Sequence, residues 1–165
     1  VPVLEAVPNF SAGQDPALLE RLVRAASEKG AEVLDASADP DHNRAVVTFV
    51  GVPEVVEDAC VAVADLAVAA IDLRRHRGVH PRVGALDVLP LVPLVGLSLD
   101  DAAAAAHRVG ERLAREVGIP VYYYGHASRP RGRKLSDLRS GGFEAIASSF
   151  PQGRSPDLLP PDWPH

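Results

Sequence analysis

The chain has 165 residues, of which 47% are hydrophobic and 24% charged, and its formal net charge is −5 at pH 7. This composition is ordinary for a soluble globular protein and excludes a disordered chain, while the negative charge argues against general nucleic-acid binding. The longest apolar stretch, 56–71, carries Glu57, Asp58 and Asp65, so it is no membrane span. We predict one domain over 1–165 with a proline-rich tail at 151–165, and we expect a cytoplasmic protein without disulfides, because Cys60 stands alone.

Hydrophobic periodicity and the positions of proline and glycine divide the chain into strands and helices. Asp15 before Pro16, and Ser98 with Asp101, are typical helix starts. In chain order the predicted elements are a strand at 1–9, a helix at 16–29, strands at 31–36 and 44–50, a helix at 53–71, a strand at 85–94, a helix at 98–117, a strand at 119–124 and short helices within 135–150. Inward-facing helix positions are predicted at Leu18, Leu19, Leu22, Val23, Ala26, Val56, Cys60, Val63, Ala67, Ala70, Ile71, Leu99, Val109, Leu113 and Val117.

The order β-α-β-β-α-β followed by α-β predicts an α+β fold. We expect a ferredoxin-like split β-α-β antiparallel sheet with a C-terminal α-β extension. Two helices would cover one face of this sheet. The other face needs a ligand, the extension or a second copy of the sheet to cover it, so the architecture favours an oligomer.

The stretch from 76 to 94 carries the strongest functional signal. His80 directly precedes Pro81, which keeps it out of helical geometry, and Gly78 and Gly84 flank it. A loop histidine of this kind suits a general base, although a histidine satisfied by backbone groups fits the same pattern. Arg82 and the basic loop at 128–134 suit either a carboxylate-binding groove or a solvated surface.

Other chemistries find little support in the sequence. The histidines at 42, 76, 80, 107, 126 and 165 lack the close spacing of metal ligands, so we expect no metal. Cys60 lies on the apolar side of a predicted helix, which does not suit a nucleophile. No serine elbow, phosphate-binding loop or dinucleotide fingerprint is present.

Several motifs, in order along nearly the whole chain, carry a family resemblance. They are VPNFSAG (7–13), DPDHNRAVVTFVG (39–51), IDLRRHRGVHPRVGALDVLPLVPL (71–94), IPVYYYG (119–125), RSGGFE (139–144) and PD (156–157). Together they resemble the N-terminal subdomain of glutamate formiminotransferase, the formiminotransferase part of formiminotransferase-cyclodeaminase. The resemblance implies a ferredoxin-like fold and transfer of a formimino group between N-formimino-glutamate and tetrahydrofolate, a step of histidine degradation.

The resemblance also implies roles for single residues. His80 matches the family's catalytic histidine and would act as the general base. Arg82 and the backbone around Gly84 are candidates for holding folate or substrate carboxylates. Asn9, Asn43 and Arg44, in matching motifs, are candidates for lining the pocket or fixing its loops. Asp35 and Ser37 are candidates for orienting His80.

The chain also departs from the family pattern. Ala12, Val79, His126 and Gly142 stand where the family usually has an acid. Since the family closes its folate cleft with a second, C-terminal subdomain, we expect a homodimer or a separate chain to complete the site. Three hypotheses remain open: a folate-dependent transferase, a folate-binding protein without transfer activity, and an interaction module that binds no folate.

Overall fold

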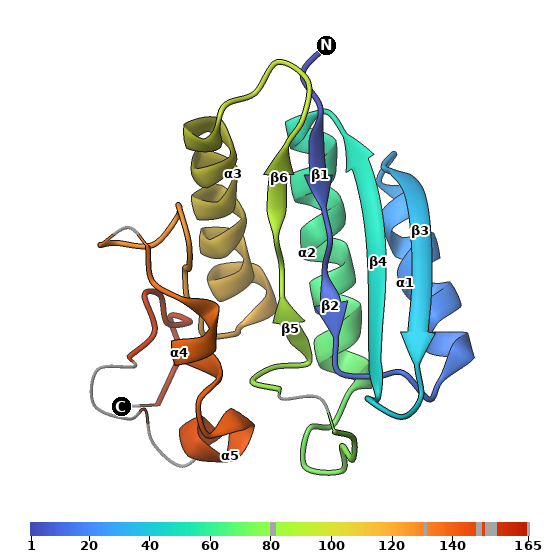
Figure 1. Cartoon of the computed structure of the whole chain (residues 1–165), viewed down its shortest axis with the longest axis vertical. Coiled ribbons are helices and arrows are strands. Elements are labelled where there is room, and N and C mark those ends of the chain that lie inside the picture. Colours follow the sequence, from blue (N-terminus) through green and yellow to red (C-terminus); the bar gives the residue numbers. More distant parts are fainter. Residues whose placement is uncertain (80–81, 131, 148–149, 151–154, 165) are drawn as a thin grey trace.

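The computed structural model describes residues 1–79, 82–130, 132–147, 150 and 155–164. An antiparallel sheet forms one layer, and helices α1 and α2 lie behind it (Figure 1). The strands are β1 (Leu4–Ala6), β2 (Asn9–Phe10), β3 (Glu32–Asp39), β4 (Arg44–Gly51), β5 (Leu86–Val88) and β6 (Leu91–Pro93). The helices are α1 (Pro16–Glu28), α2 (Pro53–Ala70), α3 (Leu99–Arg112), the π-helical turn η1 (Leu113–Val117), α4 (Leu135–Arg139) and α5 (Gly142–Ala147).

β4 lies at the centre of the sheet pairing. β3 joins it on one side, while β1 and β2, placed end to end, join it on the other. Beyond them, β1 pairs with β6 and β2 pairs with β5, all antiparallel. Pro8 separates β1 from β2 and Pro90 separates β5 from β6, because proline has no N–H to give to a ladder. The strands predicted at 1–9 and 85–94 are therefore each broken in two.

The core lies between the sheet and the helices. Alternate residues of β4 (Ala45, Val47 and Phe49) are buried on the helix side, where they meet Leu22 of α1 and Val56 of α2. The predicted helix starts are confirmed: the Asp15 side chain accepts the Leu18 N–H at 3.1 Å, and Ser98 forms a capping box with Asp101. α3 packs beside β6 and α2, and its Val109 is buried.

Some sequence predictions were wrong. The segment at 119–124 forms no regular strand, only an isolated bridge from Val121 to Leu158, because its partner is the C-terminal tail and not the sheet. Leu99, in the first turn of α3, is 59% exposed, and Ala70, at the last turn of α2, is exposed too. Glu57, an acid within the apolar stretch 56–71, is buried, and Arg108 of α3 pairs with it at 2.6 Å.

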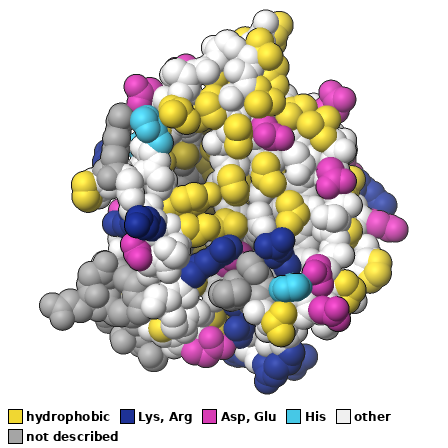
Figure 2. All heavy atoms as spheres, viewed as in Figure 1, with side chains coloured by type: hydrophobic (Ala, Val, Ile, Leu, Met, Phe, Trp, Pro, Cys, Tyr) yellow, Lys and Arg dark blue, Asp and Glu magenta, His cyan; other side chains and the backbone are white. Residues whose placement is uncertain are grey.

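None of the described helices covers the other face of the sheet. Figure 2 looks onto this open face and shows hydrophobic side chains gathered over its middle, with arginine and lysine side chains toward its lower end. The coarse prediction of an α+β chain with an antiparallel sheet and one uncovered face is confirmed. Within the described residues, no helix is long and apolar enough to cross a bilayer.

Candidate active site

The hairpin turn between β3 and β4 organises one end of the sheet. Asn43 in this turn has a left-handed backbone (φ 51°), and its side chain joins two other loops. Its Oδ1 accepts the Gly13 N–H at 2.7 Å, and its Nδ2 donates to the Arg77 carbonyl at 3.0 Å. Asn43 therefore fixes loops, one of the two roles predicted for it.

The loop that leads to His80 is packed onto this turn. The ring of His76, 6% exposed, lies with Nε2 2.9 Å from the Asn43 carbonyl, so that nitrogen carries the proton. A Cβ on Gly78 would lie 2.5 Å from the His42 carbonyl oxygen, which explains the need for glycine there. The chain is thus held firmly up to two residues before His80.

His80 and Pro81 lie outside the described residues, so the predicted catalytic side chain has no described geometry. Its neighbour Val79 is 75% exposed. Val79 therefore presents an apolar side chain to solvent at a position where the resemblance leads us to expect a carboxylate.

Beyond His80, the carboxylate of Asp87 fixes the chain. Its Oδ1 accepts the N–H groups of Val83 at 2.6 Å and Gly84 at 3.3 Å. The Gly84 carbonyl in turn accepts the Ser11 hydroxyl at 2.7 Å. The backbone amides that we predicted as carboxylate ligands around Gly84 are therefore engaged by a side chain of the same protein.

Arg82 is engaged as well. Its Nη2 donates to the Leu73 carbonyl at 3.1 Å and to Glu144 Oε1 of α5 at 2.7 Å. The guanidinium also lies 5.9 Å from the centre of the Phe143 ring. Since only 15% of the Arg82 side chain is exposed, it mainly joins the 73–84 loop to α5.

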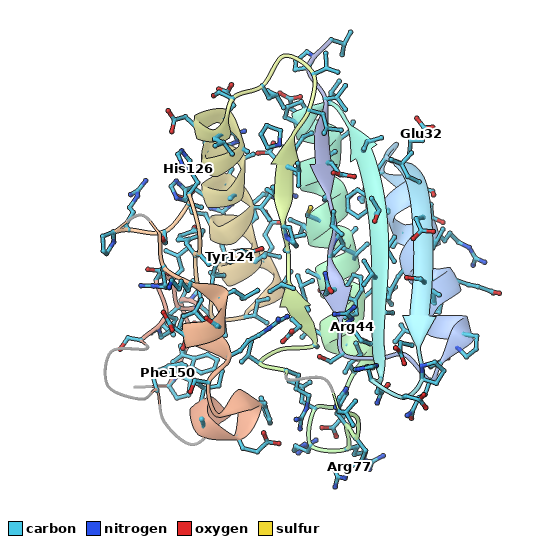
Figure 3. The ribbon with its side chains drawn as sticks, viewed as in Figure 1. Glu32, Arg44, Arg77, Tyr124, His126 and Phe150 are labelled. Atoms are coloured by element: carbon cyan, nitrogen blue, oxygen red, sulfur yellow. The ribbon has the colours of Figure 1, made fainter. Side chains whose placement is uncertain are left out.

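Asn9 and Arg44 share the open face near this loop. Asn9 pairs with Val46 of β4, and Arg44, two residues before Val46, points to the same side. Asn9 donates to the Val7 carbonyl at 2.9 Å. No described carboxylate forms an ion pair with Arg44, which lies near the lower ends of β2 and β4, above the loop that carries Arg77 (Figure 3).

The structure brings most of the predicted site residues together at one end of the sheet, but not all of them. Asn9, Asn43, Arg44, Arg82 and Gly84 all lie at the β2, β4 and β5 end of the sheet, around the loop of His80. Asp35 and Ser37 are exposed on β3, and β4 and β2 separate that strand from β5. Their role in orienting His80 stays a prediction, because His80 lies outside the described residues.

Three contacts near the site were not predicted. Arg139 forms an ion pair with Asp87 at 2.7 Å, and Glu144 forms one with Arg82 at 2.7 Å. The His76 ring is hydrogen-bonded to the Asn43 carbonyl. Asp87 stands out in the sequence as the only acid between Asp72 and Asp100, but its contacts do not. Its partner Arg139 lies 52 positions further on, and no local pattern links the two.

Charges in the preceding turn are also fixed. Arg74 donates to both oxygens of Asp72, at 2.8 and 2.9 Å, and this hydrogen bonding lowers the pKa of Asp72 to about 2. Nearby, a cavity of about 730 Å³ lies between the end of α2 and the C-terminal segments. Its lining is mostly apolar and includes Ile71, Tyr122, Phe143, Phe150 and Trp163.

Among the described residues, no three His, Cys, Asp or Glu side chains converge to hold a metal ion. The site thus consists of a histidine-bearing loop, its anchoring carboxylate and amides, and Arg44, which forms no ion pair with a described carboxylate, beside a half-apolar sheet face. This arrangement suits acid-base chemistry on an anionic substrate.

Comparison with known proteins gives the family. Residues 3–165 match the formiminotransferase domain, N-terminal subdomain. The chain belongs to this family. It is 43% identical over 162 residues to a formimidoyltransferase-cyclodeaminase of Gallus gallus, covering 96% of this chain and 30% of that protein. It is 38% identical over 163 residues to a glutamate formimidoyltransferase of Streptococcus pyogenes, covering 98% of this chain and 52% of that protein.

A glutamate formimidoyltransferase of Thermoplasma acidophilum is 41% identical over 144 residues, which are 86% of this chain and 48% of that protein. The chain therefore spans between 30% and 52% of the length of these relatives. The family resemblance seen in the motifs is confirmed.

Proposed function

We propose that this chain forms the N-terminal half of a formimidoyltransferase site, which moves a formimino group between N-formimino-glutamate and tetrahydrofolate. The match over residues 3–165, with relatives named glutamate formimidoyltransferase, carries the proposal. The anchored loop supports it, because a general base must be held in place to be effective.

In the proposed reaction, a nitrogen of tetrahydrofolate adds to the formimino carbon of N-formimino-glutamate. His80, as neutral imidazole, takes the proton from that nitrogen as the new C–N bond forms. The tetrahedral intermediate then collapses: the bond to the glutamate nitrogen breaks and His80 returns the proton to the departing amine. General acid-base help of this kind contributes about 100- to 10,000-fold.

Arg44 is the best candidate on the described surface for a substrate or folate carboxylate. It lies on the open face, and no described acid neutralises it. Arg82, with its partners in place, acts first as a support of the loop. Asn9 lies beside Arg44 and has an amide oxygen that can accept from a ligand.

The open face supports the proposal of a second wall. Val46, Thr48 and Val50 of β4 point to that side and are only half-buried. We propose that a homodimer partner or a separate chain covers this face and completes the folate cleft. The strand order, with β4 between β3 and the β1/β2 pair, also supports the finer assignment of a ferredoxin-like fold.

A second candidate function is folate binding without transfer. Val79, 75% exposed beside His80, favours it, because the family pattern leads us to expect a carboxylate that would influence the base at this position. An interaction module that binds no folate is the third candidate.

The three candidates differ in binding and in turnover. Calorimetric titration with tetrahydrofolate, at low and moderate salt, is combined with a transfer assay on the chain and on His80→Ala. The transferase binds and transfers, and His80→Ala abolishes transfer but not binding. His126→Ala is the matched control, since His126 pairs with exposed Asp100 on another part of the surface.

Binding without transfer in the unaltered chain would favour the folate binder. No binding at millimolar tetrahydrofolate would reject both folate functions for this chain and leave the interaction module. Salt should weaken binding if Arg44 holds a carboxylate, because screening reduces attraction between partly exposed charges.

A further inference from the structure

The C-terminal segment formed by α4 and α5 contacts the His80 loop on its far side. α4 ends at Arg139, and α5 begins at Gly142. Gly141 and Gly142 both have a left-handed backbone, with φ of 82° and 64°, and this sharp turn directs both helices at the loop. The two helices lie beside the start of β5 in Figure 1.

The first contact is an ion pair between Arg139 and Asp87. Arg139 Nη2 donates to Asp87 Oδ2 at 2.7 Å, while the other oxygen of Asp87 accepts the Val83 and Gly84 amides. The Asp87 side chain is 1% exposed and that of Arg139 is 22% exposed. Removing the partner of a carboxylate this deeply buried is costly, so Arg139 helps to hold Asp87 and, through it, the two amides.

The second contact is the pair between Arg82 and Glu144. It joins the loop to α5 at 2.7 Å, and the Phe143 ring lies near the same guanidinium. A Cβ on Gly142 would lie 3.4 Å from the Arg82 carbonyl oxygen, so the backbones themselves are close. The α4–α5 segment therefore touches the loop on both sides of Val83.

We infer that Arg139 is a positioning residue for His80, acting through the buried carboxylate of Asp87, and that the α4–α5 segment is a brace for the His80 loop. This inference rests on the proposed function for its effect on turnover. Its structural part, that Arg139 holds Asp87 and the Val83 and Gly84 amides, is independent of that function.

The test compares Arg139→Gln with Arg112→Gln in the full chain. Arg112 also pairs with two carboxylates, Asp58 and Glu116, but on α3, away from the loop. Two quantities are measured at a temperature where circular dichroism shows both variants folded: kcat and KM for transfer, and the His80 imidazole signal by NMR, assigned by its loss in His80→Ala.

Arg139→Gln should lower kcat by roughly 10- to 100-fold with little change in KM, as misplacement of a reacting group does. It should also shift the His80 signal. Arg139→Lys should recover part of both, because it restores the charge without the planar fork. Arg112→Gln should change neither.

If Arg139→Gln is folded and both its kcat and its His80 signal are unchanged, the inference that the α4–α5 segment braces the loop is rejected. A chain that shows no transfer, but whose His80 signal shifts in Arg139→Gln, would reject the proposed function and support the brace. If Arg139→Gln does not fold, the double variant Asp87→Asn/Arg139→Gln removes the buried charge together with its partner. Its kcat and its His80 NMR signal then test the inference in the same way.

Discussion

The side chain of Asn43 accepts the backbone N–H of Gly13 at 2.7 Å and so joins the hairpin turn to the loop before α1. The same side chain donates to the Arg77 carbonyl. One residue therefore connects three segments that are distant in sequence and that converge beside the His80 loop.

Replacing Asn43 tests this connection. Asn43→Ala removes both hydrogen bonds. It also places alanine, which has a Cβ but no polar side chain, in the left-handed backbone at φ 51°. We therefore expect it to lower the free energy of unfolding by about 1–3 kcal/mol. Asn43→Gly loses the same bonds but tolerates the backbone, so it should be less destabilised. Urea denaturation measures both. Equal midpoints for Asn43→Ala and the unaltered chain would contradict the role.

At acidic pH, the free energy of unfolding should depend on the protonation of Asp72. Its pKa is lowered to about 2 by the Arg74 guanidinium, from an ordinary value of 3.8. Stability from this pair is therefore present above about pH 3.8 and is lost as the pH falls through about 2. NMR titration of the Asp72 carboxyl should show the low pKa, and Arg74→Gln should return it toward 3.8. A titration near 4 in the unaltered chain would refute the contact.

At alkaline pH, the free energy of unfolding should depend on the Cys60 thiol. Complete burial raises the pKa of its thiol, so the folded chain keeps the proton after the unfolded chain has lost it. The stability it contributes is full below about pH 8.5 and falls above that by about 1.4 kcal/mol per pH unit. Cys60→Ala should lack this component of the slope. The thiol should also resist alkylation at pH 8 until the chain unfolds, and rapid labelling of folded protein would contradict its burial.

The C-terminal tail should depend on Asp157. Its Oδ2 accepts the Tyr123 N–H and the Arg133 guanidinium, both at 2.7 Å, and Leu158 bridges to Val121. Asp157→Ala should cost about 1–3 kcal/mol. Hydrogen exchange at the Tyr123 amide should accelerate, whereas the Val47 amide in β4 should exchange as before. Unchanged protection of Tyr123 would show that the tail is held in another way.

Local sequence patterns predicted the elements well where the chemistry is local. Asp15 and Ser98 cap helices within three residues, and the strand predicted at 44–50 is β4. Local patterns failed where a residue distant in sequence determines burial or strand pairing. Glu57 is buried because Arg108 of α3 reaches it, and 119–124 is no strand because the tail, not the sheet, bonds to Val121.

The candidate site shows the same limit. The proline after His80 and the flanking glycines mark a loop from sequence alone, and the family motif identifies the histidine. What holds that loop in place could not be predicted, because Asn43, Asp87 and Arg139 come from three separate parts of the chain. Only the folded structure brings these anchors together.

Pro8 and Pro90 interrupt neighbouring strands at nearly the same level of the sheet, where Val7 donates to the Pro90 carbonyl at 3.1 Å. Neither proline can donate to the ladder there, so the pairings of these strands fall into two halves. The half above this level holds the β1–β6 pairing, and the half below it holds Asn9, Arg44 and the His80 loop. Since β3 and β4 run past this level without a break, they connect the two halves and hold the end with Asn9 and Arg44 at a fixed position relative to the β1–β6 end.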